Sequence, residues 1–392
     1  MLRPKRARND VGSESRENKY IIFMDKPNES CVCTATLHLS SIFNFQLNMR
    51  LSESEALDLF LNAPLDELCA RANAEKERRH GKSVYWVNNR QINYTNVCVL
   101  KCRFCAFSRI KKDSPTAYDW DYETIRDKAA FAIAGGAREL HIVGGLHPDH
   151  PFDYYIEMLR KLRGEFPKVN LKAFTAVEIA HFAKLSGQTP NQIMETLKGA
   201  GLDALPGGGA EILVQSVRDE ICPGKETGEE WLGVHRAAHQ LGIPTNATML
   251  FGHIEKPEHR IAHMRMLRDL QDEAPGFFAF IPLVYHPEHN ALHNIVPNMT
   301  SQEDILRTVA VARLFLDNFP HIKAYWIQMG IETAMKALHS GASDLDGTII
   351  EEKITHAAGA KVPVGMSPER MRTLITSEGL IPVERDAKYE TY

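Results

Sequence analysis

The chain has 392 residues, a formal net charge of -4, 44% hydrophobic residues and 24% charged residues. These proportions are ordinary for a globular enzyme, and the slight negative charge argues against nucleic acid as the main partner. No run of about 18 apolar residues occurs, so the sequence predicts no membrane-inserted helix. Seven cysteines in a chain of this length do not resemble a disulfide-stapled scaffold, which favours reduced thiols and a cytoplasmic location.

The first 48 residues differ from the rest, because they start with a basic stretch and show no sustained hydrophobic period. They also lack the apolar core of a secretory signal. Two interpretations stay open, a poorly ordered arm or an artefact of start-site choice in which Met49 opens the domain. We favour the second, because Ser52 and the acidic residues after it are typical of a capped helix start.

The leucine spacing predicts helices over residues 52–80, with Pro64 dividing the pattern into two. These helices are expected to cover one end of the domain that follows. Residues 84–87 and 92–97 are rich in branched and aromatic side chains and are predicted to be strands. The second strand runs directly into Cys98, so the next residues are expected at the C-terminal end of a strand, where barrel enzymes carry their chemistry.

Three thiols lie within eight residues, at Cys98, Cys102 and Cys105. A 4Fe-4S cluster takes four thiolates, so three leave one iron with an open position for a chelating ligand. A zinc site is the main alternative, but no Cys or His occurs between Cys105 and His141 to complete it at ordinary spacing. The remaining cysteines show no second cluster spacing and are interpreted as packing residues or free thiols.

After the cysteines, predicted strands and helices alternate along the chain. The predicted strands are 139–143, 170–174, 203–205, 244–250, 277–283 and 322–329, and the predicted helices are 122–134, 152–162, a helix opened by Thr189 and Pro190, 229–241, 261–270 and 300–316. Residues 334–354 are a candidate eighth unit. This alternation is typical of parallel βαβ units.

We therefore predict an α/β fold, a TIM-type (β/α) barrel that is complete or nearly so, with an N-terminal helical extension and a C-terminal extension. The predicted boundaries are 1–48 for the N-terminal extension, 49–90 for a helical cap, 91–350 for the barrel and 351–392 for a C-terminal extension packed on the barrel.

The predicted strands end in residues that have chemical uses. Gly144 and Gly145 permit close approach of a ligand to the backbone, with a tight turn as the structural alternative. Three glycines at 207–209 lead to Glu211, whose carboxylate suits ribose hydroxyls or an ammonium group, although the spacing is not a dinucleotide fingerprint. Other polar side chains lie in or just beyond apolar strands and are expected to face a polar pocket, because burying them without partners costs several kcal/mol each: His141, Lys172, Thr175, Glu178, Asn246, Thr248, His286, Lys323 and Tyr325.

The cysteine spacing, with aromatic Phe104 before the third thiol, resembles the signature of radical S-adenosylmethionine (SAM) enzymes. Further motifs resemble the aminofutalosine synthase family specifically, and these are NYTNVC (93–98), HIVGGLHP (141–148), KAFTAVEI (172–179), LPGGGAEI (205–212), NATM (246–249), GHIE (252–255), FIPL (280–283), DNFPHIKAYW (317–326) and DLDGT (344–348). The resemblance runs from about residue 49 to residue 389.

The resemblance implies a radical SAM barrel that holds a 4Fe-4S cluster on Cys98, Cys102 and Cys105, with SAM at the fourth iron position. The residues expected to bind the cofactors are Phe104, Gly144, Gly145, Glu211 and Asn246. The implied activity is a C–C bond-forming adenosyl transfer of menaquinone biosynthesis. In it the 5'-deoxyadenosyl radical adds to 3-[(1-carboxyvinyl)oxy]benzoate, and rearrangement with loss of carbon dioxide gives 6-amino-6-deoxyfutalosine. SAM is then consumed as a co-substrate.

A substrate with two carboxylates requires cations or hydrogen-bond donors. The candidates are His141, Lys172, Arg313, His321 and Lys323, of which Lys172, His141 and Arg313 are the predicted catalytic residues. The resemblance also implies a low-potential electron donor such as flavodoxin or ferredoxin. The oligomeric state stays open, with a homodimer among the alternatives.

Three rival functions are also open. Two are related radical enzymes, a cyclic dehypoxanthinyl futalosine synthase and a deazaflavin synthase subunit, which release 5'-deoxyadenosine instead of joining it to the substrate. The third is an electron-transfer iron-sulfur protein, which requires four cysteines on its cluster.

Overall fold

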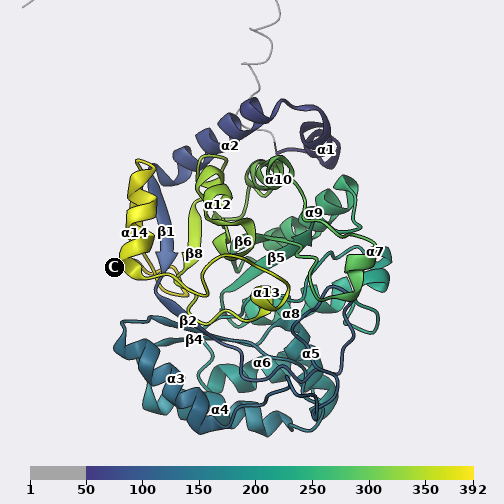
Figure 1. Cartoon of the computed structure of the whole chain (residues 1–392), viewed down its shortest axis with the longest axis vertical. Coiled ribbons are helices and arrows are strands. Elements are labelled where there is room, and N and C mark those ends of the chain that lie inside the picture. Colours follow the sequence, from purple (N-terminus) through teal and green to yellow (C-terminus); the bar gives the residue numbers. More distant parts are fainter. Residues whose placement is uncertain (1–49) are drawn as a thin grey trace, which may run out of the picture. The chain divides into compact units, whose positions relative to one another are not determined.

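The computed structural model of the chain describes residues 50–392, which form one compact unit (Figure 1). The expectations for residues 1–48 lie outside the described residues, and the predicted boundaries at residues 90 and 350 stay predictions. Within the described part of the chain, every helix is too short or too polar to cross a lipid bilayer.

Two helices precede the first strand, α1 (Glu53–Asn62) and α2 (Leu65–His80). Ser52 caps α1 in a capping box with Glu55, in which each side chain accepts from the other residue's backbone N–H. Pro64 separates the two helices, as the sequence predicts. Helix α2 packs beside α10 (Gln302–Phe315), as Figure 1 shows, so the N-terminal helices cover part of the barrel's outer helical layer.

The described residues contain nine strands in three parallel sheets, ordered β8-β1-β9, β2-β3-β4 and β5-β6-β7. The strands are β1 (Ser83–Val87), β2 (Asn89–Ile92), β3 (Glu139–Ile142), β4 (Asn170–Ala173), β5 (Thr245–Phe251), β6 (Phe277–Val284), β7 (His321–Ile322), β8 (Asp344–Gly347) and β9 (Ile381–Glu384). Isolated parallel bridges link the sheet edges, at Lys172–Ala204, Leu205–Thr245 and Lys323–Asp344. The fold is therefore barrel-like, with sheets that do not join into one closed ladder.

Helices alternate with these strands as expected for parallel βαβ units. Between β2 and β7 lie α3 (Tyr122–Ala134), α4 (Phe152–Glu165), α5 (Ala176–Ser186), α6 (Pro190–Gly199), α7 (Gln215–Ile221), α8 (Gly228–Gln240), α9 (Pro257–Glu273), the 3-10 helix η1 (Ala291–Asn294) and α10. After β7 lie α11 (Trp326–Met329), α12 (Ile331–Leu338), α13 (Ile354–Ala357) and α14 (Pro368–Ser377). The predicted helix at residues 122–134 is confirmed to the residue.

Two predicted strands overlap the observed ones at a single residue. The predicted strand at 92–97 shares only Ile92 with β2, because the side chains of Asn93 and Asn96 donate to the carbonyls of Val143 and Thr116 and draw the backbone into a loop. Cys98 therefore follows a loop and not a strand, contrary to the prediction. Of the predicted strand at 322–329, only Ile322 belongs to a strand, β7. Residues 326–329 form helix α11, where the Trp326 indole donates to the Gly347 carbonyl at 2.9 Å.

Two other expectations are wrong in detail. The predicted strand at 203–205 makes only isolated bridges, and the Asp203 carboxylate accepts from the Leu171 N–H at 2.9 Å. The N-cap of α10 is Ser301, which accepts from the Asp304 N–H, and not Thr300 as the predicted capping box requires. Helix α5 was missed altogether, although Thr175 and Glu178 form a capping box at its start.

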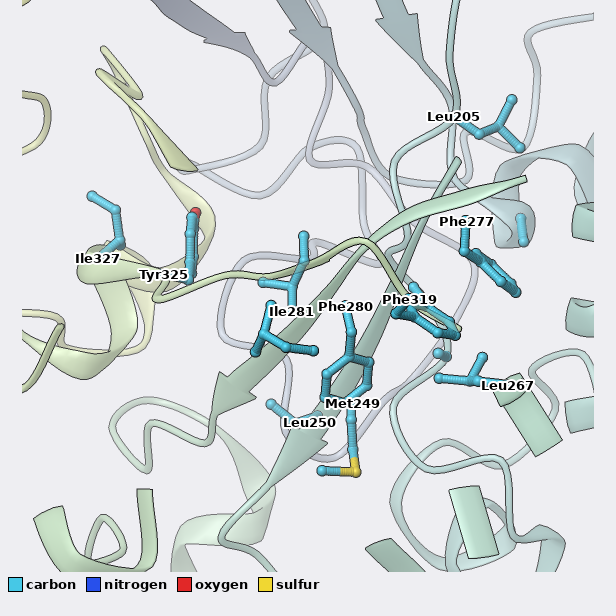
Figure 2. Packing of buried hydrophobic residues seen from close by; sticks show 14 of the residues in the cluster. Leu205, Met249, Leu250, Leu267, Phe277, Phe280, Ile281, Phe319, Tyr325 and Ile327 are labelled. Carbon is cyan, nitrogen blue, oxygen red and sulfur yellow. The ribbon is translucent and has the colours of Figure 1, made fainter. Parts of the chain in front are cut away.

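The buried core fills the space between the sheet and the helices around it. Figure 2 shows Phe280 of β6 between Met249 of β5 and Phe319, with Leu267 of α9 beside Phe319. The rings of Phe277 and Phe319 are stacked with centroids 5.3 Å apart. Every residue of β5 is buried, as is typical of a parallel strand covered on both faces.

Candidate active site

A cavity of about 320 Å³ lies where the barrel strands end. Its walls come from the residues that follow β2, β3 and β4, from the glycine-rich segment 206–209, from the ends of β5 and β6, and from the segment after β8. This is the end of a (β/α) barrel where active sites are found. The cavity brings together residues from far apart in the sequence, from Asn89 to Ala358.

Cys98, Cys102 and Cys105 all line this cavity and are half-buried. The loop that carries them is held by its backbone, because the Cys98 N–H donates to the Arg109 carbonyl at 2.9 Å and the Cys105 N–H to the Cys102 carbonyl at 3.1 Å. Burial raises the pKa of Cys98 and raises that of Cys102 to about 12, so a cationic centre is needed to keep these sulfurs as thiolates.

Three converging thiols fit a 4Fe-4S cluster with one open iron position. Among the described residues, no further cysteine lines the cavity. Cys222 is buried and lies close enough to Cys102 to affect its charge, but it does not reach the cavity. The donor set therefore leaves room for one non-protein ligand on the cluster.

Gly144 and Gly145 line the cavity beside Cys98, and both have a packing reason to be glycine. A Cβ on Gly144 would lie 2.6 Å from the Tyr94 ring, and one on Gly145 would lie 2.2 Å from the Val97 carbonyl oxygen. The Gly144 N–H donates to the buried Glu178 carboxylate, which also accepts from the Tyr94 hydroxyl. These two glycines thus form a closely packed turn, and they also face the cavity, where a ligand has room to approach the backbone. Both alternatives from the sequence, the tight turn and the ligand contact, are compatible with this position.

Glu211 lies in the cavity wall in a left-handed backbone conformation, with φ of 48°. Its carboxylate pairs with Lys225, which also lines the cavity. The Lys225 ammonium lies 5.7 Å from the centroid of the Phe104 ring. Burial lowers the pKa of Lys225, but Glu211 and the other acidic groups around it together outweigh burial, and the net shift is upward. The cluster loop therefore has a permanent cation next to it.

Lys172 and His141 lie on the floor of the cavity, one on each of two paired strands. The Lys172 ammonium is 3.5 Å from the Glu139 carboxylate, and His141 Nδ1 is 4.0 Å from it. Burial raises the pKa of Glu139, but Lys172 and His141 bring it down to about 2. Burial lowers the pKa of His141 to about 4, so its imidazole is neutral and acts as a hydrogen-bonding group at neutral pH.

The remaining predicted residues divide into two groups. Asn246, Thr248 and His286 line the cavity as expected. Arg313 does not, because its guanidinium is fully buried and donates to the carbonyls of Phe319 and Pro320 at 2.6 and 3.0 Å.

Arg313 therefore holds the turn after α10, and its predicted catalytic role is corrected to a structural one. His321 and Lys323 also lie outside the cavity. His321 stacks on Tyr389 with centroids 4.3 Å apart, and Lys323 pairs with Asp346 at 3.3 Å.

Sequence reasoning missed several cavity residues, and the charged ones with partners are Lys225, Asp346 and Glu352. Lys225 follows Cys222, Pro223 and Gly224 in a turn, and no local period marks it as buried. Glu352 precedes α13 and caps it, accepting from the Thr355 N–H at 2.7 Å. A turn signal in the sequence locates such a residue in a loop without saying which way it faces.

Three further side chains, Asp119, His147 and His150, bring potential ligand atoms within 4.8 Å of one another outside the cavity. His150 Nε2 lies 2.7 Å from the Asp119 carboxylate. His147 Nδ1 accepts from the Asp149 N–H at 3.2 Å, so the proton of the neutral ring is on Nε2, toward Asp119. A metal on Nε2 requires the opposite tautomer, and the cluster is best described as a hydrogen-bonded link between two loops.

The segment after β8 closes the cavity, since Ile354, Thr355 and Ala358 line it around α13 (Figure 1). The helix is fastened by Glu352, whose carboxylate lies 2.6 Å from His356 Nδ1. The hydrogen bond with Glu352 raises the pKa of His356 above the usual 6.5, while burial opposes the shift. The charged pair therefore stabilises the folded state as long as His356 is protonated.

We expect His356→Gln to change how stability depends on pH. A raised histidine pKa contributes stability that is fully present below about pH 6.5 and is lost as the pH rises through the folded-state value. The wild-type chain should lose up to about 1 kcal/mol relative to the variant between pH 6 and pH 9, because the pair is partly exposed. Urea unfolding at the two pH values measures the difference, and parallel curves would contradict the assignment.

The chain is similar in sequence to known proteins over most of its length. Residues 92–267 match the Radical SAM superfamily, and residues 274–392 match the CofH/MqnC C-terminal region. Aminodeoxyfutalosine synthase of Thermus thermophilus is 46% identical over 342 residues, covering 87% of this chain and 92% of that protein. The Streptomyces coelicolor enzyme of that name is 41% identical, covering 87% and 90%. This chain belongs to the aminodeoxyfutalosine synthase family.

Further similar proteins have a lower sequence identity to this chain. Cyclic dehypoxanthine futalosine synthase of Streptomyces coelicolor is 38% identical, covering 87% of this chain and 85% of that protein. The crystal structure of methylornithine synthase (PylB) superposes with a TM-score of 0.69 at 16% identity, covering 86% of this chain and 95% of that one. The predicted radical SAM barrel fold is confirmed, and the chain is a radical SAM enzyme.

Proposed function

We propose that this protein is an aminodeoxyfutalosine synthase, which joins the adenosyl C5' of SAM to 3-[(1-carboxyvinyl)oxy]benzoate. The carbon radical adds to the enol ether double bond, the intermediate rearranges onto the arene, and the carboxyl group leaves as carbon dioxide. The electron supplied at the start is given back after this loss, so the product is closed-shell and the reaction is redox-neutral overall. The product is 6-amino-6-deoxyfutalosine, and methionine is released. One observation carries the proposal: the three cluster cysteines and Lys172 line the same cavity.

When bound, a reduced 4Fe-4S cluster supplies the electron that splits SAM into methionine and the 5'-deoxyadenosyl radical. The protein positions the two reactants and excludes water from the radical. Apolar side chains from several strand ends, among them Val143, Leu250 and Ile281, line the cavity together with the cysteines. These apolar side chains help to exclude water from the part of the cavity where the radical reacts.

The cavity floor suits the carboxylates of the substrate. Lys172 is only 3% exposed, and within residues 50–392 its one ion-pair partner is Glu139, at 3.5 Å. That separation is long for a charge-assisted hydrogen bond, so the ammonium retains capacity to bind a second carboxylate. His141, neutral and adjacent, is able to donate a further hydrogen bond. We assign both residues to substrate positioning.

At the opposite wall, Phe104, Gly144, Gly145, Glu211 and Asn246 are proposed to surround SAM, with Lys225 added to this group. Glu211 and Lys225 offer an anion and a cation next to the cluster loop, which matches the ammonium and carboxylate of a methionyl group. The proposal also requires a low-potential electron donor such as flavodoxin or ferredoxin. Reduced thiols and an oxygen-sensitive cluster favour the cytoplasm as the compartment.

Anaerobic turnover with competing substrates tests the function. The reconstituted enzyme is given SAM and dithionite with 3-[(1-carboxyvinyl)oxy]benzoate, or alternatively with dehypoxanthine futalosine. We expect mass spectrometry to find 6-amino-6-deoxyfutalosine in the first mixture and only background cleavage of SAM in the second. Cyclisation in the second mixture with no adduct in the first would assign the chain to the cyclic dehypoxanthine futalosine synthases.

Lys172→Met is expected to uncouple SAM cleavage from product formation. The substitution keeps the length of the side chain and removes the charge, so the benzoate loses a buried carboxylate partner at a cost of about 2 to 5 kcal/mol. Product formation should fall by at least about thirtyfold, while 5'-deoxyadenosine accumulates. Lys168→Met, an exposed lysine before β4, serves as the control. Equal loss of SAM cleavage and product would contradict a role in substrate binding.

A further inference from the structure

The cysteine loop separates two spaces. Cys102 and Cys105 line the inner cavity, and they also line a second, open groove of about 1120 Å³ on the outer side of the loop. The outer groove is shared with residues of the 288–293 segment, where the Leu292 N–H donates to the Arg103 carbonyl at 2.9 Å. A cluster held by these cysteines would be reached from inside by substrates and from outside through this groove.

The outer groove is strongly cationic. Lys101, Arg103, Arg109 and Lys111 line it, against the single carboxylate of Glu288. The chain as a whole carries a net charge of -4, so this concentration of positive charge is a local departure from the composition. Such an asymmetry is the electrostatic feature that steers a partner of opposite charge.

These cations are arranged in two ways. Arg109 is fixed, because its guanidinium donates to the carbonyls of Ala106, Phe107 and Ser108 at 2.9 to 3.1 Å. Lys101 and Lys111 are exposed, and within residues 50–392 neither forms an ion pair. The fixed cation stiffens the loop beside Cys105, and the two lysines remain available to an outside partner.

Apolar side chains accompany the charges. Val99 and Ile110 belong to the same loop and are 46% and 54% exposed. A small anion needs no such contacts, whereas protein interfaces combine apolar anchors with charged rims. The size and openness of the groove also fit a macromolecular surface better than an enclosed small-molecule site.

We propose that this groove is the docking surface for an acidic one-electron carrier protein, which binds with its redox centre against the outer face of the cysteine loop. The inference rests on the proposed function, because only a radical SAM reaction requires this electron. The step transfers one electron, oxidising the carrier and reducing the cluster by one electron each. Lys101 and Lys111 attract the acidic surface of the carrier, and Ile110, which lines the groove, packs against it.

Binding of oxidised flavodoxin, an acidic carrier, tests the surface without relying on turnover. Isothermal titration calorimetry of the anaerobically reconstituted enzyme should give a Kd that rises steeply between about 50 and about 300 mM KCl, because salt screens the attraction between the two proteins. The double variant Lys101→Glu/Lys111→Glu should raise the Kd by about tenfold or more. The matched control Lys168→Glu, at the opposite ends of the strands, should stay within about twofold. Iron content and the absorption spectrum establish that each variant is folded and loaded.

An unchanged Kd in the double variant, or an equal loss in Lys168→Glu, would overturn the assignment. So would an oligonucleotide that binds as tightly as flavodoxin and is lost in the same variant, because the groove would then recognise polyanions in general. Turnover with dithionite separates this inference from the function. Product formed with dithionite but no flavodoxin binding refutes the docking surface alone. Normal docking without product refutes the proposed function alone.

Discussion

Replacing Cys102 with alanine should abolish both cluster binding and product formation. Cys102 contributes one of only three cysteine sulfurs in the cavity among the described residues, and two thiolates cannot hold a 4Fe-4S cluster firmly. Cys102 also lines the groove on the other side of the loop. Among the described residues the only other cysteines in the cavity are Cys98 and Cys105, so no spare thiol there replaces it. We expect the iron content to fall by at least about tenfold and the adduct to be undetectable by mass spectrometry.

Cys69→Ala is the matched control, because Cys69 is half-buried and interacts with Ser340, away from the cavity. It should retain full iron and activity. Cys222→Ala is a second control, since Cys222 lies near Cys102 but outside the cavity. Full iron loading in Cys102→Ala together with loss of iron in Cys222→Ala would mean that the ligand set is wrong.

Arg385→Met should destabilise the protein by about 3 to 5 kcal/mol. Arg385 is fully buried, and its guanidinium lies 2.7 Å from the Asp344 carboxylate, which is itself fully buried. Burial raises the pKa of Asp344, but Arg385 and Lys323 outweigh it and the net shift is downward. Removing the arginine leaves that charge with the Tyr389 hydroxyl at 2.8 Å, the Asp346 backbone N–H at 2.6 Å and the more distant Lys323.

The comparison variant is Arg372→Met, which breaks the more exposed pair between Arg372 and Glu384 at 3.0 Å. Its cost should stay below about 1 kcal/mol. Urea unfolding of the reconstituted proteins gives both values. The double variant Arg385→Met/Asp344→Asn should recover part of the loss, since it removes both buried charges. A double variant as unstable as the sum of its single variants would contradict the ion-pair account.

Local signals predicted much of the fold. Helix α3 was predicted over its full length, because an apolar period of 3.6 lies between the capping Asp121 and Gly135. Helix α5 was missed because Thr175 and Glu178 were interpreted only as pocket residues; Thr175 does line the cavity, and the two residues also form the capping box of the helix. Strand β7 was predicted too long, since the apolar run continues into α11 and periodicity alone does not separate a short strand from a buried helix.

The candidate site was predictable where the chemistry is local. The three cysteines lie within eight residues, their spacing alone predicts a metal site, and the structure places all three in one cavity. Arg313 was misassigned because its role depends on carbonyls that a turn brings to it, which no spacing reports. Lys225 was missed for the same reason, because its partner Glu211 lies on another loop. Residues defined by tertiary contacts need the structure.

The destination of the adenosyl carbon tests the central claim most directly. The enzyme is reconstituted anaerobically and given SAM labelled with ¹³C in the adenosyl ribose, a chemical reductant and 3-[(1-carboxyvinyl)oxy]benzoate. We predict that the label appears in 6-amino-6-deoxyfutalosine, with one labelled product for each methionine released. Label found only in free 5'-deoxyadenosine, with the benzoate substrate unchanged or merely dehydrogenated, would contradict the account.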